Sequence, residues 1–462
     1  MKEVLRDGRF RIMAVLCLVL LLVAVYTGKR YYEFVNAQHS EAAAKERLNW
    51  IQQDAKNPHS AAHYGTHAFK PKHPLSLIDQ GVDKYTGVSI YLEAHLRNEA
   101  QFMAAQDQTA LSRFGDLTPD FILLFLIPLL IVLVGFNAIT REKESGTLRL
   151  LQSMGVSPVK LALGKWLGIF IPVLALIALV FLIAAILLNN LSDFGEFSLS
   201  ALLLLFLIYL LYYATFSNLV LLVSAWVKKS NIAFVILLAL WIIACLAMPK
   251  LGTNLADSLY PYPTQQEFLE AVNEDKKKGL DGHDPWNAAA QKLQEEVLAE
   301  HGVDSLHKLP FNFDGYLMQK GEEHEAEIFF KHYEHLKEIY ENQSRLYRSA
   351  SLLSPFLPAR FLSMALCRTD YHSHWHFSDQ AEKYRLQMMN ALNMDFADNS
   401  SYGDWSYKSD PELWTKIEPF NYQPPDYATV ISSNTSNFLV LLIWFLLSGA
   451  MLVYRCNELK TV

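Results

Sequence analysis

Three alternating histidines are the first residues in this sequence whose spacing suggests chemistry. The run "DYHSHWHFSDQAEKYR" holds His372, His374 and His376. On a β-strand, this spacing directs all three side chains to one face, as a metal site requires. In a polar turn between two amphipathic helices, the same imidazoles would cap helix ends or stack on Tyr371 and Trp375. Alternation alone supplies no outer groups to orient the ligands, so the turn is favoured and no metal is expected.

The sequence lacks the common catalytic and nucleotide-binding motifs. Gly164-Lys165 has neither the upstream glycine nor the following Ser or Thr of a phosphate-binding loop. His324-Glu325 begins a zinc-protease pattern, but Ile328 stands where a helix would present the second histidine. There is no G-x-S-x-G turn for a nucleophilic serine either. We therefore expect no catalytic residue and no cofactor in this chain.

Apolar residues make up 52% of the 462 residues, and they are gathered in blocks. A helix needs about 20 apolar residues to cross a bilayer. Six windows meet or approach that length. They are Ile12–Thr27, Phe121–Ile139, Leu167–Leu188, Leu202–Val227, Ile232–Met248 and Phe438–Tyr454. The first window could be a signal peptide, but it lacks a clean cleavage site, so a retained anchor is favoured.

Basic residues in the short loops predict the orientation. Placing both termini in the cytoplasm puts most of these residues inside. They are Lys2, Arg6, Arg9, Arg11, Arg141, Lys143, Arg149, Lys160, Lys165, Lys228, Lys229, Arg455 and Lys460. Lys29 and Arg30 run against this assignment, whereas the short outside loop "NNLSDFGEFSLS" has no basic residue. The chain then divides into segment and span 1–27, insert 28–120, spans 121–248 with cytoplasmic segment 140–166, insert 249–437, and span and tail 438–462.

Both inserts read as mainly helical. "SIYLEAHLRNEAQFMAAQ" is the clearest helix of the smaller insert. In the larger insert, Thr264 and Glu267 form a capping box. Asp284 is expected as the N-cap of a helix that places Trp286 on its core face and ends before Gly302. A longer helix is expected over about 322–350.

The fourth span carries a stripe of polar side chains. Tyr209, Tyr213 and Ser217 recur every four residues, with Asn218 beside them. Hydroxyl and amide groups in a span can bond to carbonyls of their own helix or of a neighbouring helix. They can also line a substrate path or a dimer interface, because intramembrane polar groups face protein or cavity. Both interpretations stay open at this point.

The charged stretch "REKESGTLRLLQSMGVSPVKLALGKW" lies between the second and third spans. It resembles the cytoplasmic loop of ABC-2-type transporter permeases, whose pattern is approximately E-[KR]-E-x-G-T-L-x-x-L-x-x-x-x-[VI]-[ST]-x-x-x-[IL]-x-x-[GA]-K. The matching residues are Glu142, Lys143, Glu144, Gly146, Thr147, Leu148, Leu151, Val156, Ser157, Leu161, Gly164 and Lys165. The six spans with both termini inside also agree with that family.

The large inserts resemble one subgroup of these permeases. The stretch "SPFLPARFLSMALCRTDYHSHWHF" and the later "AEKYR" are similar to the subgroup named DUF3526. Where that subgroup tends to have Gly before Thr-Asp, this chain has Arg368. The resemblance implies an α-helical membrane protein with six transmembrane helices of ABC-2 permease type and two mainly helical extracytoplasmic inserts.

The resemblance also implies partners. Two permease chains, identical or homologous, would bind two cytoplasmic ABC ATPase subunits, and these partners would hold ATP and Mg²⁺. In that reading the permease is a multi-pass protein of the bacterial inner membrane, surrounded by lipid. The residues expected to couple it to the ATPase are Glu142, Lys143, Glu144, Gly146, Thr147, Leu148 and Leu151. The outside inserts could receive substrate or dock a periplasmic partner. The alternative is a membrane-anchored binding or scaffold protein, and the net charge of -7 gives no nucleic-acid signal.

Overall fold

The computed structural model of this chain describes residue 4 and residues 6–107, 117–191 and 197–459. Six helical stretches are long and apolar enough to cross a membrane, which confirms the six predicted spans. They are Gly8–Ile51, Pro119–Glu144, Pro158–Asn189, Leu199–Trp226, Ser230–Leu259 and Thr435–Glu458. Lys2, Lys460 and residues 192–196 of the short loop, used above to predict orientation, lie outside the described residues.

The spans are built from the following helices. They are α2 (Gly8–Ile51), α5 (Pro119–Phe121), η3 (Ile122–Leu126), α6 (Ile127–Gly135), α7 (Thr140–Glu144), α9 (Pro158–Asn189), α10 (Leu199–Trp226), α11 (Ser230–Ile242), η4 (Ile243–Ala247), α12 (Met248–Leu259) and α20 (Thr435–Glu458). α8 (Thr147–Ser153) lies between the second and third spans. η3 and η4 are wider π-type turns within their spans. α10 lies at the centre of the bundle, where it packs on α6, α9, α11, α16 and α20.

The remaining elements are mostly beyond the spans. They are α3 (Pro58–Tyr64), β1 (Thr66–Phe69), η1 (Pro74–Leu77), β2 (Ser89–Glu93), β3 (Leu96–Arg97), α4 (Ala104–Asp107), α13 (Gln265–Lys276), α14 (Ala288–His301), η5 (Leu306–Lys308), α15 (Phe313–Ser349), η6 (Ala350–Leu352), α16 (Phe356–Cys367), α17 (Tyr371–Asn399), α18 (Glu412–Lys416) and α19 (Tyr427–Ser433). We call the part that holds α3, the three strands, α13–α15, α17 and α18 the distal domain.

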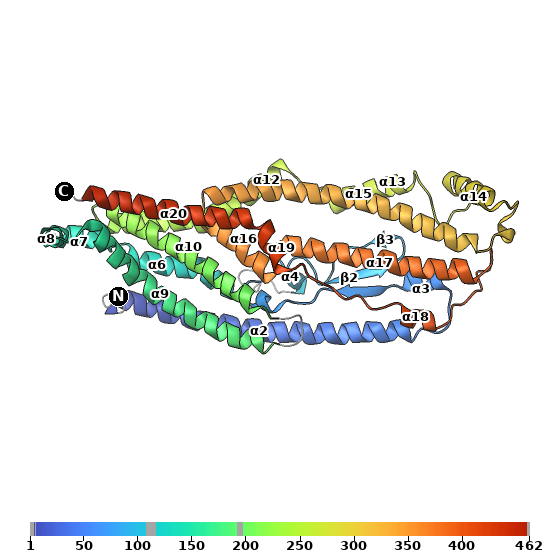
Figure 1. Cartoon of the computed structure of the whole chain (residues 1–462), viewed down its shortest axis with the longest axis horizontal. Helices are drawn as coiled ribbons and strands as arrows, with labels where there is room; N and C mark the ends of the chain where they lie inside the picture. Colours follow the sequence, from blue (N-terminus) through green and yellow to red (C-terminus); the bar gives the residue numbers. More distant parts are fainter. Residues whose placement is uncertain (1–3, 5, 108–116, 192–196, 460–462) are drawn as a thin grey trace.

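The molecule is elongated, and both chain ends lie with α7 and α8 at one end of its long axis (Figure 1). The distal domain occupies the other half, with α14 at the far end. α2 runs without a break from the bundle into the distal domain. Its 44 residues span about 66 Å, roughly twice the thickness of the hydrocarbon layer. The first predicted span, Ile12–Thr27, is therefore only the early part of a helix that continues into the first insert.

The predicted helix over 89–106 is wrong. β1, β2 and β3 form an antiparallel sheet in which Ala68 pairs with Ile90 and Leu92 pairs with Arg97. Ile90 and Leu92 are buried in one core with Phe377 of α17. Two apolar residues at a spacing of two fit a half-buried strand, and tertiary packing decides in favour of that pattern.

The histidine run differs in secondary structure from both interpretations of the sequence, although the ring of His374 does pack against Tyr371, with centroids 5.7 Å apart. His372, His374 and His376 lie in the first turns of α17, so they form neither a strand nor a turn. At helical spacing His372 and His376 share one side, and His374 points elsewhere. Asp370 caps this helix through the amide of Ser373.

Some helix ends in the larger insert lie where the sequence predicts them, and others do not. The Thr264–Glu267 capping box and the helix end at Gly302 are confirmed. The N-cap of α14 is Asn287 rather than Asp284, and Trp286 is 81% exposed instead of facing a core. The helix predicted over 322–350 begins earlier, at Phe313, because Asn312 caps it.

Arg368 occupies a position that favours glycine. It ends α16 with a φ of 57°, in the left-handed region where Gly is the usual residue after a helix. A glycine at this position would adopt that conformation without strain. In this chain the arginine bonds to the Pro425 carbonyl and stacks over the Tyr427 ring, which offsets the backbone cost.

The arrangement predicts that α8 and α14 are reached from opposite faces of the membrane. Met154→Cys and Trp286→Cys place thiols at positions that are 71% and 81% exposed. An impermeant maleimide should label the first variant in vesicles of one orientation and the second in vesicles of the other. The unsubstituted chain is the control and should stay unlabelled, since its four cysteines are all buried. Labelling of both variants from the same face would contradict this topology.

Candidate functional site

Charged side chains of the segment between the second and third spans bond to the ends of two other spans. Lys143 Nζ donates to the carbonyls of Ser224, Ala225 and Val227 at distances of 3.3, 2.5 and 2.8 Å, at the end of α10. Glu144 accepts from the amide and the hydroxyl of Ser230 at 2.7 Å each, at the start of α11. A cation at a helix C-terminus and an anion at an N-terminus both satisfy backbone groups that the helix leaves unpaired. α7 is therefore fastened to the ends of α10 and α11.

Glu142 fastens the same segment to the third span. It accepts from Lys165 Nζ of α9 at 2.7 Å and from the Thr147 hydroxyl at the start of α8. Gly146 lies between α7 and α8 with a φ of 74°, a left-handed conformation that glycine adopts without strain. The charged residues that resemble the family motif thus all make contacts inside this chain.

The exposed apolar residues of α8 are not those that the sequence comparison selected. Leu148 is only 8% exposed and Leu151 is half-buried, whereas Leu150 and Met154 are 60% and 71% exposed. On the other side of α8, Gln152 donates to the Leu459 carbonyl at 2.9 Å, beside the end of α20. Leu150 and Met154 therefore form an exposed apolar surface at this segment.

The predicted polar stripe of the fourth span is buried inside the bundle. Tyr209 and Tyr213 have no exposed surface, and Ser217 bonds back to the Tyr213 carbonyl at 2.8 Å. Tyr209 bonds to Ser363 of α16 at 2.8 Å. Asn218 donates to the Phe445 carbonyl of α20 at 3.1 Å. In this conformation Tyr209, Tyr213 and Asn218 join α10 to its neighbours, whereas Ser217 bonds within α10.

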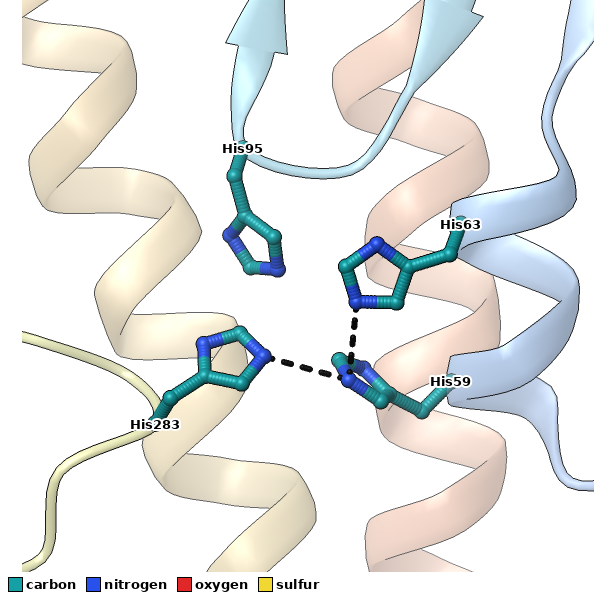
Figure 2. A group of neighbouring side chains, drawn as sticks. All are labelled: His59, His63, His95 and His283. Carbon is teal, nitrogen blue, oxygen red and sulfur yellow. Dashed lines mark hydrogen bonds between the residues drawn. The ribbon is translucent and has the colours of Figure 1, made fainter.

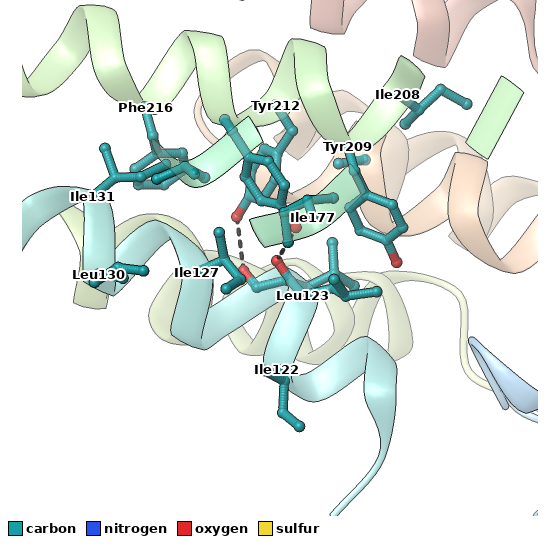
Figure 3. Packing of buried hydrophobic residues seen from close by; sticks show 14 of the residues in the cluster. Ile122, Leu123, Ile127, Leu130, Ile131, Ile177, Ile208, Tyr209, Tyr212 and Phe216 are labelled. Carbon is teal, nitrogen blue, oxygen red and sulfur yellow. Dashed lines mark hydrogen bonds between the residues drawn. The ribbon is translucent and has the colours of Figure 1, made fainter. Parts of the chain in front are cut away.

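Three aromatic side chains close the π-type turn η3. Tyr213, Tyr212 and Trp241 donate to the carbonyls of Leu123, Leu124 and Phe125 at 2.9, 2.9 and 3.1 Å. Figure 3 shows Tyr212 reaching from α10 toward this turn, among Ile127, Ile131 and Phe216. Pro128 follows this turn and has no N–H to donate to the carbonyls of Leu124 and Leu123, four and five residues earlier, and no water replaces that donor in a bilayer. The two tyrosine hydroxyls supply donors to these carbonyls, and Trp241 adds a bond to the next one.

Comparison with family models agrees with the membrane bundle. A model described as ABC-2 family transporter protein matches residues 36–249. The chain carries an ABC-2 transporter domain. A domain of unknown function, DUF3526, matches residues 265–423, which covers most of the larger insert. No curated protein matches the sequence. The predicted resemblance to ABC-2 permeases with a DUF3526 insert is thereby confirmed, as is a multi-pass membrane protein.

A cluster of four histidines lies beyond the ABC-2 spans, in the distal domain (Figure 2). His59 and His63 project from one face of α3, His95 from the turn between β2 and β3, and His283 from the loop between α13 and α14. His59 Nε2 lies 3.1 Å from His63 Nε2 and 3.1 Å from His283 Nε2. One nitrogen of each ring lies within 4.8 Å of the others. We call these residues the four-histidine cluster.

Two carboxylates hold His95 in place. Its Nδ1 lies 2.9 Å from Glu322 and 3.2 Å from Glu325, both on α15. Its backbone amide also donates to Glu322 at 2.6 Å, although its φ of 66° is an unusual conformation for a residue with a side chain. Arg385 of α17 bonds to the other oxygen of Glu322 at 2.9 Å, and both groups are buried. The turn is thus held by a buried ionic network.

Close backbone contact places His283. Its loop passes α15 at Gly282 and Gly321, where a Cβ on Gly321 would lie 2.6 Å from the Gly282 Cα. Only glycine permits this approach. The His283 amide also donates to Asp281 at 2.8 Å, which tightens the loop. His283 is therefore brought to the cluster by α15, the helix that also carries Glu322 and Glu325.

Burial and charge give the cluster unusual acidities. Burial, with the neighbouring imidazoles, lowers the pKa of His59 to about 3, so this ring is neutral at pH 7. Burial also lowers the pKa of His63 and of His283. For His95, burial acts in the same direction, but the hydrogen bonds to Glu322 and Glu325 outweigh it and raise the pKa to about 9.

The alternating histidines that the sequence pattern singled out lie outside this cluster. His372, His374 and His376 are not among the groups that the described residues place close enough to share a metal ion. His376 bonds to the Tyr422 hydroxyl at 3.1 Å instead. The one local signal for the four-histidine cluster was the spacing of His59 and His63, four residues apart and so on one face of a helix. His95 and His283 come from distant segments, and nothing in the sequence indicates that they meet.

The buried network predicts a large effect of Arg385→Met. This change leaves Glu322 and Glu382 without their shared cation, and breaking a buried pair costs about 3–5 kcal/mol. The midpoint of thermal unfolding of the purified protein should fall by several degrees. Lys308→Met is the matched control, because it removes an exposed pair with Asp304 that is worth about 0–1 kcal/mol. Equal midpoints for the two variants would argue against the network.

Proposed function

We propose that this chain is the membrane-spanning permease subunit of an ABC transporter. It moves a substrate across the bacterial inner membrane with energy from ATP that a separate cytoplasmic ATPase hydrolyses with Mg²⁺. The ABC-2 transporter domain supports the permease assignment. The distribution of basic residues among the short loops supports an orientation in which both termini, α7 and α8 are cytoplasmic.

One observation supports a role for the α7 and α8 segment in coupling the ATPase to the spans. The α7 and α8 segment is bonded to the ends of α10, α11 and α20 through Lys143, Glu144 and Gln152. Each contact is made to backbone groups at or beside a helix end, so a displacement of the segment moves those helices directly. A partner that binds the exposed face of α8 would therefore act on three spans at once.

The ATPase supplies the movement in this mechanism. Closure of the ATPase dimer on ATP would push α8, and α7 would pass the displacement to α10 and α11 as rigid bodies. α10 carries Tyr209, Tyr213, Ser217 and Asn218, so its rotation would exchange the contacts that these residues make with α16, α20 and the second span. In this way the polar stripe would border a substrate path, or a dimer interface, during part of the cycle.

A second permease chain completes the proposed transporter. It is either an identical copy or a homologue, and the two chains bind two ATPase subunits. Lipid covers the exposed apolar faces of the spans, such as Leu182, Ile186 and Leu203. The distal domain receives substrate or docks a periplasmic partner.

Copurification distinguishes this function from that of a membrane-anchored scaffold. A permease should bring down an ATPase that contains a phosphate-binding loop, and its presence should stimulate ATP hydrolysis. A scaffold whose spans serve only as anchors should do neither.

The exposed face of α8 gives the sharpest test. Leu150→Asp and Met154→Asp together place charges in the proposed apolar contact. We expect association with the ATPase to fall at least about thirtyfold, equivalent to about 2 kcal/mol. Trp286→Asp is the control, because it changes an even more exposed apolar residue at the other end of the molecule. Unchanged ATPase binding and unchanged stimulation in the double variant would refute docking through this face.

The motif residues should behave differently. Glu142→Lys with Glu144→Lys removes contacts inside the chain, and Leu148→Asp buries a charge. These variants should lower the thermal stability of the permease itself as well as ATPase binding. The Leu150 and Met154 variants should lower only ATPase binding.

A further inference from the structure

The four-histidine cluster brings one ring nitrogen of each histidine within 4.8 Å of the others. His59 Nε2 faces the Nε2 atoms of His63 and His283 at 3.1 Å each. A neutral imidazole offers one N–H and one lone pair, so His59 Nε2 cannot satisfy both neighbours. His95 Nε2 is buried without a hydrogen-bond partner among the described residues. A cation at the centre of the cluster would satisfy all of these atoms.

The distances fit a tetrahedral metal ion. Zinc binds imidazole nitrogen at about 2.0–2.1 Å, which places neighbouring ligand atoms of a tetrahedron about 3.3 Å apart. The two separations of 3.1 Å are close to that value. The other ligand atoms lie within 4.8 Å, so small rotations of the His63, His95 and His283 rings complete the geometry.

The surroundings of His95 are those of an oriented ligand. A ligating histidine usually donates its second N–H to a carboxylate, which fixes the ring and its tautomer. His95 Nδ1 has two such partners, Glu322 at 2.9 Å and Glu325 at 3.2 Å. With Nδ1 engaged, Nε2 is the atom that remains for a metal. Arg385 in turn fixes Glu322, so the support extends through two layers of side chains.

The ligand set indicates the kind of ion. Four imidazoles suit Zn²⁺, Cu²⁺, Ni²⁺ or Co²⁺, whereas Ca²⁺ and Mg²⁺ require oxygen ligands. Four protein ligands leave no open position for water or substrate, which is typical of a structural zinc site. His63 and His283 are exposed, so an ion can enter from solvent.

We propose that His59, His63, His95 and His283 bind one Zn²⁺ ion that joins the two inserts of the distal domain. The first three residues come from the smaller insert and His283 from the larger one, so the ion crosslinks residues that are 188 to 224 positions apart in the sequence. This departs from the expectation, based on sequence, that the chain holds no metal. Metal binding and ATPase docking are separate properties of opposite ends of the molecule.

The test measures metal in the purified full-length protein. After treatment with a chelator and addition of ZnCl₂, the natural chain should retain about one zinc per chain on desalting, and its unfolding midpoint should rise with zinc. His59→Ala with His63→Ala should lose both the bound zinc and the zinc-dependent rise. His335→Ala with His372→Ala is the matched control, since it removes two exposed histidines outside the cluster and should bind zinc like the natural chain.

Two further variants guard against a folding defect. His283→Ala changes only an exposed loop residue and should reduce zinc affinity at least tenfold. Glu325→Gln keeps all four ligands but weakens the support of His95, so affinity should fall roughly tenfold to a hundredfold. Co²⁺ in place of Zn²⁺ should give the visible absorption of a tetrahedral nitrogen site. Absence of stoichiometric zinc in the natural chain, or equal binding by the natural chain and the His59 and His63 variant, would overturn the proposal.

Discussion

The hydrocarbon layer contains no water to satisfy a free backbone carbonyl, and the membrane bundle is built around this constraint. In the second span Pro128 has no N–H for the carbonyls of Leu123 and Leu124, and the hydroxyls of Tyr213 and Tyr212 bond to them instead, with Trp241 bonded to the next carbonyl. These bonds also fix the rotation of α10 and α11 against the second span. The same principle operates at the helix ends, where Lys143 and Glu144 satisfy the last carbonyls of α10 and the first amide of α11. Backbone satisfaction thus both stabilises the bundle and connects its parts.

The distal domain depends on a second buried polar assembly. Arg385, Glu322 and His95 connect α17, α15 and the strand turn, which belong to both inserts. Such groups are costly to bury, and they are tolerated because each one has hydrogen-bonded partners. The result is a rigid support on which α3 and the loop of His283 converge.

The sequence predicts the membrane part of this protein well, because hydropathy over a window of 20 residues is a local property. The capping box at Thr264 is local too, and it was found. The strands at 89–97 were missed because Ile90 and Leu92 adopt that pattern only through packing against α17. The role of Glu142 as an internal contact was hidden for the same reason, since Lys165 is 23 residues away.

The four-histidine cluster marks the limit of such reasoning. His59 and His63 could be paired from their spacing, but His95 and His283 approach them only after two inserts fold together. The alternating histidines of α17 gave the more visible pattern and lie outside any group close enough to share an ion among the described residues. The spacing of residues in a sequence shows which side chains share a face only when the type of secondary structure is known.

The unbroken path of α2 has a geometric consequence. A helix about 66 Å long acts as a lever whose fulcrum lies in the membrane. A tilt of about 5° there would sweep the far end of α2, about 45 Å from the middle of the membrane, through roughly 4 Å, and a chain with a hinge at the membrane surface would lose this amplification. The part of the distal domain that rests on α2 would then be carried along as a load on that arm.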